Sequence, residues 1–193
     1  IVGLLAQAFL IKQGGEKIVH DPRLVWNTFD IVEQYQGIAV QSKSGHAFIK
    51  DVMREHNAVY GGEMSAHHYF RDFACCDSGM IPWLLTIALL SETGQSLSTL
   101  VENMITKFPC SGEINFKVAD TQATVQKIFD HYADQNPLVD RTDGVSLDFG
   151  AWRLNVRASN TEPLLRLNIE SRADQNPQPM QHYVDELTGL IQG

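Results

Sequence analysis

The chain has 193 residues, which is enough for one large domain or two small ones. Its net charge of −8 at pH 7 argues against a nucleic-acid surface or a surface for anionic membranes, because both require clustered lysine and arginine. No apolar run approaches the roughly 20 residues that span a bilayer. The three cysteines suit neither a disulfide framework nor a zinc spacing, which is typical of reduced thiols in a cytoplasmic protein.

The first ten residues, IVGLLAQAFL, predict a helix that begins without a capping residue. A signal peptide would show a basic region and a small-residue cleavage site, and this segment shows neither. Because the chain opens inside an apolar run and not on methionine, we expect it to be part of a longer protein whose first domain is truncated at its N-terminal edge.

Helices and short apolar strands alternate over the first hundred residues. This rhythm is typical of an α/β layer in which helices cover parallel strands. The predicted helices lie near 1–13, 24–36, 46–56, 79–92 and 96–107, and the predicted strands near 17–20, 38–40 and 58–60.

The pattern changes in the turn-rich segment 108–113, FPCSGE, which we interpret as a domain boundary. We therefore expect a three-layer α/β domain with a mostly parallel sheet over 1–108, followed by a small α+β domain over 109–193. The elements predicted for the second domain are strands near 113–118, 138–149, 151–157 and 163–171, and helices near 120–134 and 180–191.

The segment 157–163, RASNTEP, lies between two predicted strands and is the strongest local signal. Its hydroxyl and amide side chains, and a turning backbone, can direct several donors at one anion. Arg157 adds a planar guanidinium suited to phosphate. Four arginines and two glutamates between residues 151 and 172 predict a positive patch. On composition alone, a polar turn between strands explains the same segment.

The segment 60–70, YGGEMSAHHYF, directly follows a predicted strand, where open α/β sheets bind their ligands. Glu63 can accept hydrogen bonds from two sugar hydroxyls, and Ser65 and His67 can donate or accept them. This set suits a polyol better than a metal, because adjacent histidines in an extended segment point in different directions. A glycine turn with solvated polar residues is the alternative.

Polar residues also follow the two preceding strands. Lys43 and His46 lie at one strand-to-helix junction, where they can neutralise phosphate or transfer a proton. Asp21-Pro22-Arg23 follows the first strand and can add charge to the same place. A solvated lysine and a helix-starting histidine are the simpler interpretation. Taken together, the loops predict a cleft between the two domains that binds a phosphorylated sugar.

These motifs resemble those of the α-D-phosphohexomutase family. The segment 62–67 is similar to the family's sugar-binding loop, and 157–163 is similar to the phosphate-binding loop of its fourth domain. The segment 43–46, KSGH, looks like the family's Lys-Thr-Gly-His, with serine in place of threonine. Glu-Met-Ser followed by histidine resembles the bacterial phosphomannomutase branch, and the resemblance covers essentially the whole chain.

The resemblance implies a fold, with domain 3 followed by a TATA-box-binding-protein-like domain 4, and a role for each candidate residue. Sugar-binding residues are Glu63, Ser65 and His67; phosphate-binding residues are Arg157, Ser159, Asn160 and Thr161; and candidates for cleft electrostatics or proton transfer are Lys43 and His46.

The resemblance also implies the chemistry of a longer parent protein. A phosphoserine in its first domain exchanges phosphate with a hexose phosphate through a hexose bisphosphate, and its second domain binds Mg²⁺. This chain contains neither a serine loop nor an Asp-x-Asp-x-Asp motif, so we expect no metal ligand in it and no activity from it alone. The implied partners are the hexose phosphates and domains 1 and 2 of the same parent, with no nucleic acid and no membrane.

Four alternatives for the function stay open. The parent is a phosphomannomutase that supplies GDP-mannose for surface polysaccharides, a phosphoglucomutase, or a hexose mutase of dual specificity. In a different class, the chain is a non-catalytic module that binds sugar phosphates.

Overall fold

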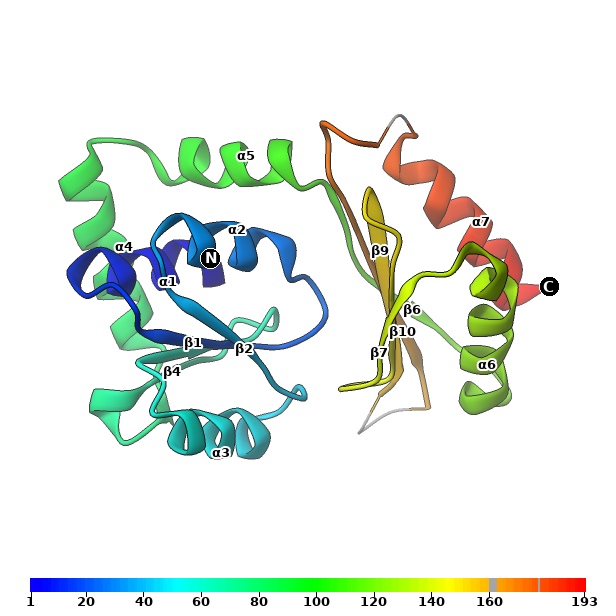
Figure 1. Cartoon of the computed structure of the whole chain (residues 1–193), viewed down its shortest axis with the longest axis horizontal. Helices are drawn as coiled ribbons and strands as arrows, with labels where there is room; N and C mark the ends of the chain where they lie inside the picture. Colours follow the sequence, from blue (N-terminus) through cyan, green and yellow to red (C-terminus); the bar gives the residue numbers. More distant parts are fainter. Residues whose placement is uncertain (160–162, 177) are drawn as a thin grey trace. The chain divides into compact units, whose positions relative to one another are not determined.

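The computed structural model describes residues 1–159, 163–176 and 178–193. The chain divides into two compact units, Ile1–Met104 and Ile105–Gly193, called unit 1 and unit 2 (Figure 1). Within the described residues, no helix combines the length and the apolar character needed to cross a membrane.

Unit 1 is built on one mixed sheet with the strand order β2-β1-β3-β4-β5. Strand β1 runs parallel to β2 and β3, whereas β4 is antiparallel to β3 and to β5. The elements are α1 (Val2–Lys12), β1 (Lys17–His20), α2 (Trp26–Gln34), β2 (Ile38–Gln41), α3 (His46–His56), β3 (Tyr60–Gly62), β4 (His68–Phe70), β5 (Cys76–Asp77), α4 (Met80–Thr93) and α5 (Leu97–Lys107).

Helices cover both faces of this sheet, with α1 and α2 on one side and α3 on the other (Figure 1). Ile18 and Tyr60 belong to the core under α1 and α2, while Val19 and Tyr69 belong to the core under α3. Because adjacent residues of a strand point to opposite faces, apolar residues in succession are what a doubly covered strand requires. The predicted three-layer α/β domain is therefore confirmed.

Unit 2 is built on an antiparallel sheet with the order β6-β10-β9-β8-β7. Helices α6 and α7 lie on the same side of it (Figure 1). The elements are β6 (Cys110–Phe116), α6 (Thr121–Tyr132), β7 (Leu138–Asp140), β8 (Val145–Asp148), β9 (Trp152–Ala158), β10 (Leu165–Ser171) and α7 (Met180–Gln192). This is the α+β arrangement that the sequence predicts.

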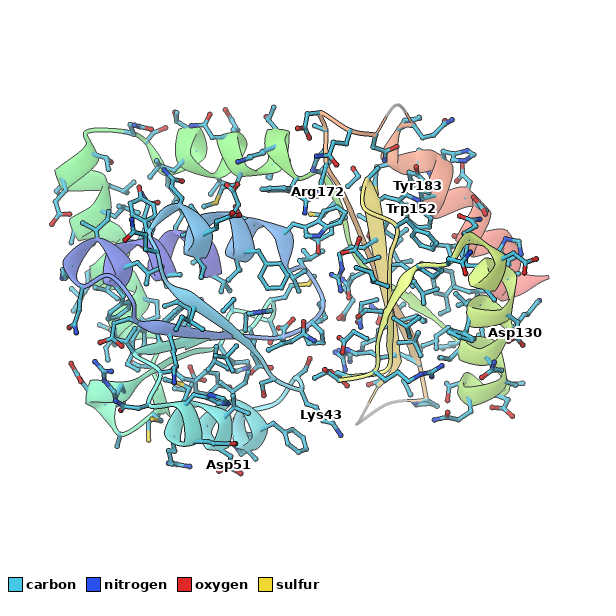
Figure 2. All side chains as sticks on the ribbon, viewed as in Figure 1. Lys43, Asp51, Asp130, Trp152, Arg172 and Tyr183 are labelled. Carbon is cyan, nitrogen blue, oxygen red and sulfur yellow. The ribbon has the colours of Figure 1, made fainter. Side chains whose placement is uncertain are left out.

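Strand β9 shows how unit 2 separates its core from its charges. Trp152, Leu154 and Val156 join the core beneath α6 and α7, where the Trp152 ring stacks on Tyr183 with centroids 4.2 Å apart (Figure 2). The alternate residues Arg153 and Arg157 must then point to the opposite face. Alternation along the strand therefore places these arginines on the face of the sheet away from the helices.

Candidate functional site

Three strand ends meet at one edge of the unit 1 sheet. Strands β1, β2 and β3 are parallel and in register, so that His20 pairs with Gln41 on one side and with Gly62 on the other. The residues that follow them are therefore neighbours in space, and the Ser42 amide donates to the His20 carbonyl at 2.9 Å. The structure brings together the three junctions that the sequence singled out in unit 1.

Glu63 lies at the centre of this edge and is only 3 % exposed. Its Oε1 accepts a hydrogen bond of 2.7 Å from the Gly45 amide, and its Oε2 accepts one of 2.7 Å from the Tyr69 hydroxyl. Burial, and then the bond to Glu63, raise the pKa of Tyr69, so the phenol remains the donor. Because helix α3 begins at His46, Glu63 also binds the residue that caps this helix.

Asp21 and Arg23 fix the same loop from the end of β1. Arg23 Nη2 donates to Asp21 Oδ2 at 2.6 Å, and the Met64 amide donates to that oxygen at 2.7 Å. The Arg23 guanidinium also donates to Ser65 Oγ at 3.2 Å and lies 3.8 Å from the Glu63 carboxylate. A buried ion pair thus joins the first strand end to the third.

The tip of the hairpin between β3 and β4, called the 63–67 loop, is a tight turn. The Glu63 amide donates to the His67 carbonyl at 2.9 Å, and the Ala66 amide donates to the Glu63 carbonyl at 3.0 Å. Ala66 adopts a left-handed backbone with φ of 65°. Ser65 and His67 are exposed on this turn, so both side chains are accessible to a ligand.

Asp77 orients the imidazole of His67. His67 Nδ1 lies 2.7 Å from Asp77 Oδ2, and the His68 amide donates to Asp77 Oδ1 at 3.0 Å. Burial raises the pKa of Asp77, but the bonds from His67 and His68 outweigh this and hold the pKa below its usual value. An ionised carboxylate only accepts, so His67 Nδ1 carries a proton and Nε2 remains for a ligand.

Lys43 and His46 flank the junction between β2 and α3. Both are exposed, and the Lys43 ammonium lies 5.8 Å from the centroid of the Phe48 ring. Lys43 is on the loop that leads from β2 into α3 (Figure 2). Gly45, which binds Glu63, lies between Lys43 and His46, and both side chains are exposed and accessible to an anion.

A buried pair lies beneath the loop. Tyr60 Oη and His68 Nδ1 are 2.7 Å apart, and both residues are buried. Burial is the main cause that lowers the pKa of His68 to about 4, and burial also raises the pKa of Tyr60. Near neutral pH both groups are uncharged, so they support the hairpin without adding charge to it.

In unit 2, Arg157 is buried on β9. Its guanidinium lies 3.8 Å from Glu113 and 3.9 Å from Asp143, and Arg166 lies 3.2 Å from Glu113. Arg153 pairs with Glu170 at 2.7 Å. The predicted positive patch needs correction, because Glu113 and Asp143 are distant in sequence but add negative charge next to these arginines.

The end of β9 carries the remaining candidates for phosphate binding. Ser159 donates its amide to the Leu164 carbonyl at 2.8 Å. Asn160 and Thr161 lie outside the described residues. The bond from Ser159 thus links the end of β9 to the residue before β10.

Sequence reasoning did not assign Tyr69 or Asp77 a role, and it gave Asp21 and Arg23 only a general charge. The signal for the last two was available, since a carboxylate and a guanidinium directly follow the first of three parallel strands. Asp77 lies on β5, and the sequence did not predict β5 or β4 because both strands are very short. Across the described parts of the chain, no cluster of three or more His, Cys, Asp or Glu residues could hold a metal ion.

Two family models match the chain. "Phosphoglucomutase/phosphomannomutase, alpha/beta/alpha domain III" matches residues 1–108, and "Phosphoglucomutase/phosphomannomutase, C-terminal domain" matches residues 113–187. A protein named "Phosphohexose mutases" from Xanthomonas campestris is 61% identical over 193 residues, covering 100% of this chain and 43% of the relative. A "Phosphomannomutase" from Vibrio cholerae is 57% identical over 192 residues, covering 99% of this chain and 41% of the relative.

Solved structures share the fold. The crystal structure of a phosphoglucomutase/phosphomannomutase family protein from Burkholderia thailandensis superposes with a TM-score of 0.72 at 24% identity, covering 99% of this chain and 41% of that one. An N-acetylphosphoglucosamine mutase from Aspergillus fumigatus, in complex with GlcNAc-6P and magnesium, superposes with a TM-score of 0.60 at 13% identity, covering 99% of this chain and 42% of that one. The chain thus spans about two fifths of the proteins it matches. By its sequence over both units, the chain belongs to the phosphoglucomutase/phosphomannomutase family.

Proposed function

We propose that this chain holds the substrate in a phosphomannomutase that interconverts mannose 6-phosphate and mannose 1-phosphate. The observation that carries the proposal is the 63–67 loop. There, Glu63 is fixed by bonds of 2.7 Å from Gly45 and from Tyr69, while Ser65 and His67 remain exposed beside it. A rigid acceptor next to an accessible hydroxyl and imidazole suits recognition of a sugar through its hydroxyl groups.

The chemistry of Glu63 is consistent with a sugar ligand. An ionised carboxylate offers about four acceptor positions, and the bonds from Gly45 and Tyr69 occupy two of them. Each oxygen therefore retains capacity for a hydroxyl donor. We assign Glu63, Ser65 and His67 to the sugar hydroxyls.

We assign Arg157, Ser159, Asn160 and Thr161 to the phosphate that is not transferred. Support comes from the placement of Arg157 on a strand, where its guanidinium lies 3.8 Å from Glu113 and 3.9 Å from Asp143. These carboxylates hold the guanidinium in place, and a phosphate would compete well for it because of bidentate geometry and higher charge.

In this proposal Lys43 and His46 neutralise charge on the phosphoryl group or move a proton at the reacting oxygen. Phosphoryl transfer depends mainly on positioning and charge stabilisation, so such residues matter without bonding to phosphorus.

Magnesium, present in the Aspergillus complex, would neutralise charge on the phosphoryl oxygens. We assign the magnesium ion and the phosphoserine that forms the bisphosphate intermediate to the rest of the parent protein, and we place the enzyme in cytoplasmic GDP-mannose synthesis for surface polysaccharides.

A hexose mutase of broader specificity is the second candidate. It is favoured by the relative with 61% identity, whose name refers to hexoses in general. The two candidates differ in the ratio of kcat/KM for mannose and glucose phosphates. A ratio strongly in favour of mannose supports the first, and a ratio near one supports the second.

The test uses the complete protein that contains this chain, assayed with Mg²⁺ and each hexose phosphate. Ser65→Ala should lower kcat/KM about tenfold, the equivalent of one lost hydrogen bond of about 1.4 kcal/mol. Ser91→Ala is the matched control, because Ser91 is exposed on α4 and donates only within its own helix, to the Ile87 carbonyl at 2.9 Å. Absence of mutase activity in the complete protein toward every hexose phosphate would refute the proposal.

A further inference from the structure

Asp21 and Arg23 have no role in the function proposed above, yet they are among the most buried charged residues of the chain. Asp21 is 3 % exposed and Arg23 is 4 % exposed. Both follow β1 directly, at the edge of the sheet where the 63–67 loop begins. Removing two charges from water is costly unless they are paired and hydrogen bonded, so their burial needs an explanation.

The two residues form a compact unit with several bonds. The Arg23 amide donates to Asp21 Oδ1 at 2.9 Å, and Arg23 Nη2 donates to Asp21 Oδ2 at 2.6 Å. A three-residue turn that is bonded through both its backbone and its side chains has little freedom to rearrange. The guanidinium is therefore held at a fixed position relative to β1.

From this position the pair contacts three successive residues of the loop. Arg23 Nη2 lies 3.8 Å from Glu63 Oε1, Asp21 Oδ2 accepts from the Met64 amide at 2.7 Å, and Arg23 Nη2 donates to Ser65 Oγ at 3.2 Å. The contacts involve a side-chain charge, a backbone N–H and a hydroxyl. Together they constrain both the position of the loop backbone and the direction of its side chains.

The bond to Ser65 has a chemical consequence. A guanidinium can only donate, so Ser65 Oγ is the acceptor in this bond and keeps its own hydrogen for another partner. The Glu63 oxygens act as acceptors, from the Gly45 amide and from the Tyr69 hydroxyl. The loop then presents one donor and one acceptor in a fixed order, which restricts the hydroxyl geometry that a ligand can satisfy.

We propose that Asp21 and Arg23 are positioning residues that set the sugar specificity of the 63–67 loop. This inference rests on the proposed function of that loop in binding a sugar. The pair acts through Glu63, Met64 and Ser65, and a displacement of about 1 Å in such a loop is enough to lower the rate on the order of 100-fold.

The test compares variants in the complete protein that contains this chain. Arg23→Met removes the guanidinium, Arg23→Lys keeps the charge and some donors, and Asp21→Asn weakens the acceptor for the Met64 amide. Arg71→Met is the matched control. It removes an arginine that binds both oxygens of Glu16 at 3.0 Å in the same unit, at the opposite edge of the sheet.

Two readouts are needed. The first is kcat/KM for the hexose phosphates and for analogues that each lack one ring hydroxyl. The second is hydrogen–deuterium exchange of the amides in residues 63–67, which does not depend on activity. A merely structural role would lower thermal stability and affect every substrate equally.

We expect Arg23→Met to lower kcat/KM on the order of 100-fold for the full sugar and much less for the analogue that lacks the hydroxyl held by the loop. Arg23→Lys should recover part of the loss. The Met64 amide should exchange faster in Asp21→Asn and Arg23→Met, and as in the unsubstituted protein in Arg71→Met. If Arg23→Met fails to fold, Arg23→Lys and Asp21→Asn decide the question.

The proposal is overturned if these variants exchange and react like Arg71→Met, or if every analogue loses activity by the same factor. If loop exchange increases as expected but the unsubstituted protein acts on no hexose phosphate, the positioning role is supported and the proposed function is the part that fails.

Discussion

The two candidate binding regions are built in different ways. In unit 1 the polar residues lie on a hairpin turn, and carboxylates from other segments hold that turn through its backbone, as Asp21 does at Met64 and Asp77 at His68. In unit 2 the main residue, Arg157, lies within a seven-residue strand whose ladder continues on both sides. One site depends on tertiary contacts and the other on the sheet itself.

The difference shows what each ligand requires. Discrimination among hydroxyl groups needs donors and acceptors placed accurately, and a turn that is fixed from several sides provides this. Holding a phosphate needs charge and a planar donor, which Arg157 supplies from β9 beside the carboxylates of Glu113 and Asp143. We therefore expect substitutions near the loop to change selectivity and substitutions on β9 to change affinity.

The largest effect should come from Arg157→Ala in unit 2. Loss of one buried charged contact to the phosphate should cost about 2–4 kcal/mol of transition-state binding in the complete protein. The measurement is kcat/KM for mannose and glucose phosphates, and both should fall by the same factor. Arg172→Ala is the control, because Arg172 donates to the Gly150 carbonyl at 3.1 Å beyond the end of β10. A loss that differs strongly between the two sugars would break the comparison.

A smaller effect is expected for the turn beside Arg157. Gly144 has φ of 71°, and a Cβ there would lie 2.5 Å from Arg157 Cβ and would also meet the Val156 carbonyl. Gly144→Ala should therefore destabilise unit 2 by about 2–3 kcal/mol, through backbone strain and overpacking together. Denaturant unfolding measures this.

Gly150→Ala is the control for that substitution. Gly150 has a similar φ of 84° but nothing within 4 Å of its Cβ position, so only the strain of about 1 kcal/mol remains. Equal losses of unfolding free energy in the two variants would mean that close packing between Gly144 and the Arg157 segment of β9 does not contribute to stability.

The smallest effect concerns pH and unit 1. The pKa of His68 falls from 6.5 in the unfolded chain to about 4 in the folded one. As pH falls from 6.5 towards 4, the unfolded state therefore takes up a proton before the folded state does, and stability decreases. His68→Gln should remove this slope, which is on the order of 1 kcal/mol per pH unit, from urea unfolding measured between pH 7 and 4.

Asp77 acts in a different range. Its lowered pKa contributes stability that is lost only as pH falls below about 3.8, so it does not obscure the effect of His68. If His68→Gln keeps the same pH dependence as the unsubstituted chain between pH 6.5 and 4, the buried Tyr60–His68 pair does not support the hairpin.

The sequence predicts most of the fold because the elements are long or strongly patterned. Helix α3 is found with the same bounds, 46–56, and the alternation along β9 predicts its two faces. Strands β4 and β5 have three and two residues, which is too short for alternation to be recognised. Strand β3 begins two residues later than predicted, because its pairing with β1 decides its bounds.

The sequence predicts which segments form the unit 1 site but not how they are connected. Parallel strands bring their ends to one edge, so the neighbourhood of 21–23, 42–46 and 60–70 follows from topology. Residue patterns do not encode backbone directions. Those directions decide that the Gly45 amide binds Glu63 and that Asp21 binds the Met64 amide. The same holds for Glu113 and Asp143, which reach Arg157 only through strand pairing.

The bond between the Gly45 amide and Glu63 has a consequence for engineering. It joins the segment that carries Lys43 and His46 to the loop that carries Ser65, so neither can be exchanged independently. A transplant of residues 62–67 from a relative with another sugar preference would arrive without its own supports. We expect such chimaeras to work only when residues 21–23 and 42–46 come from the same donor, because the three segments are hydrogen bonded to one another.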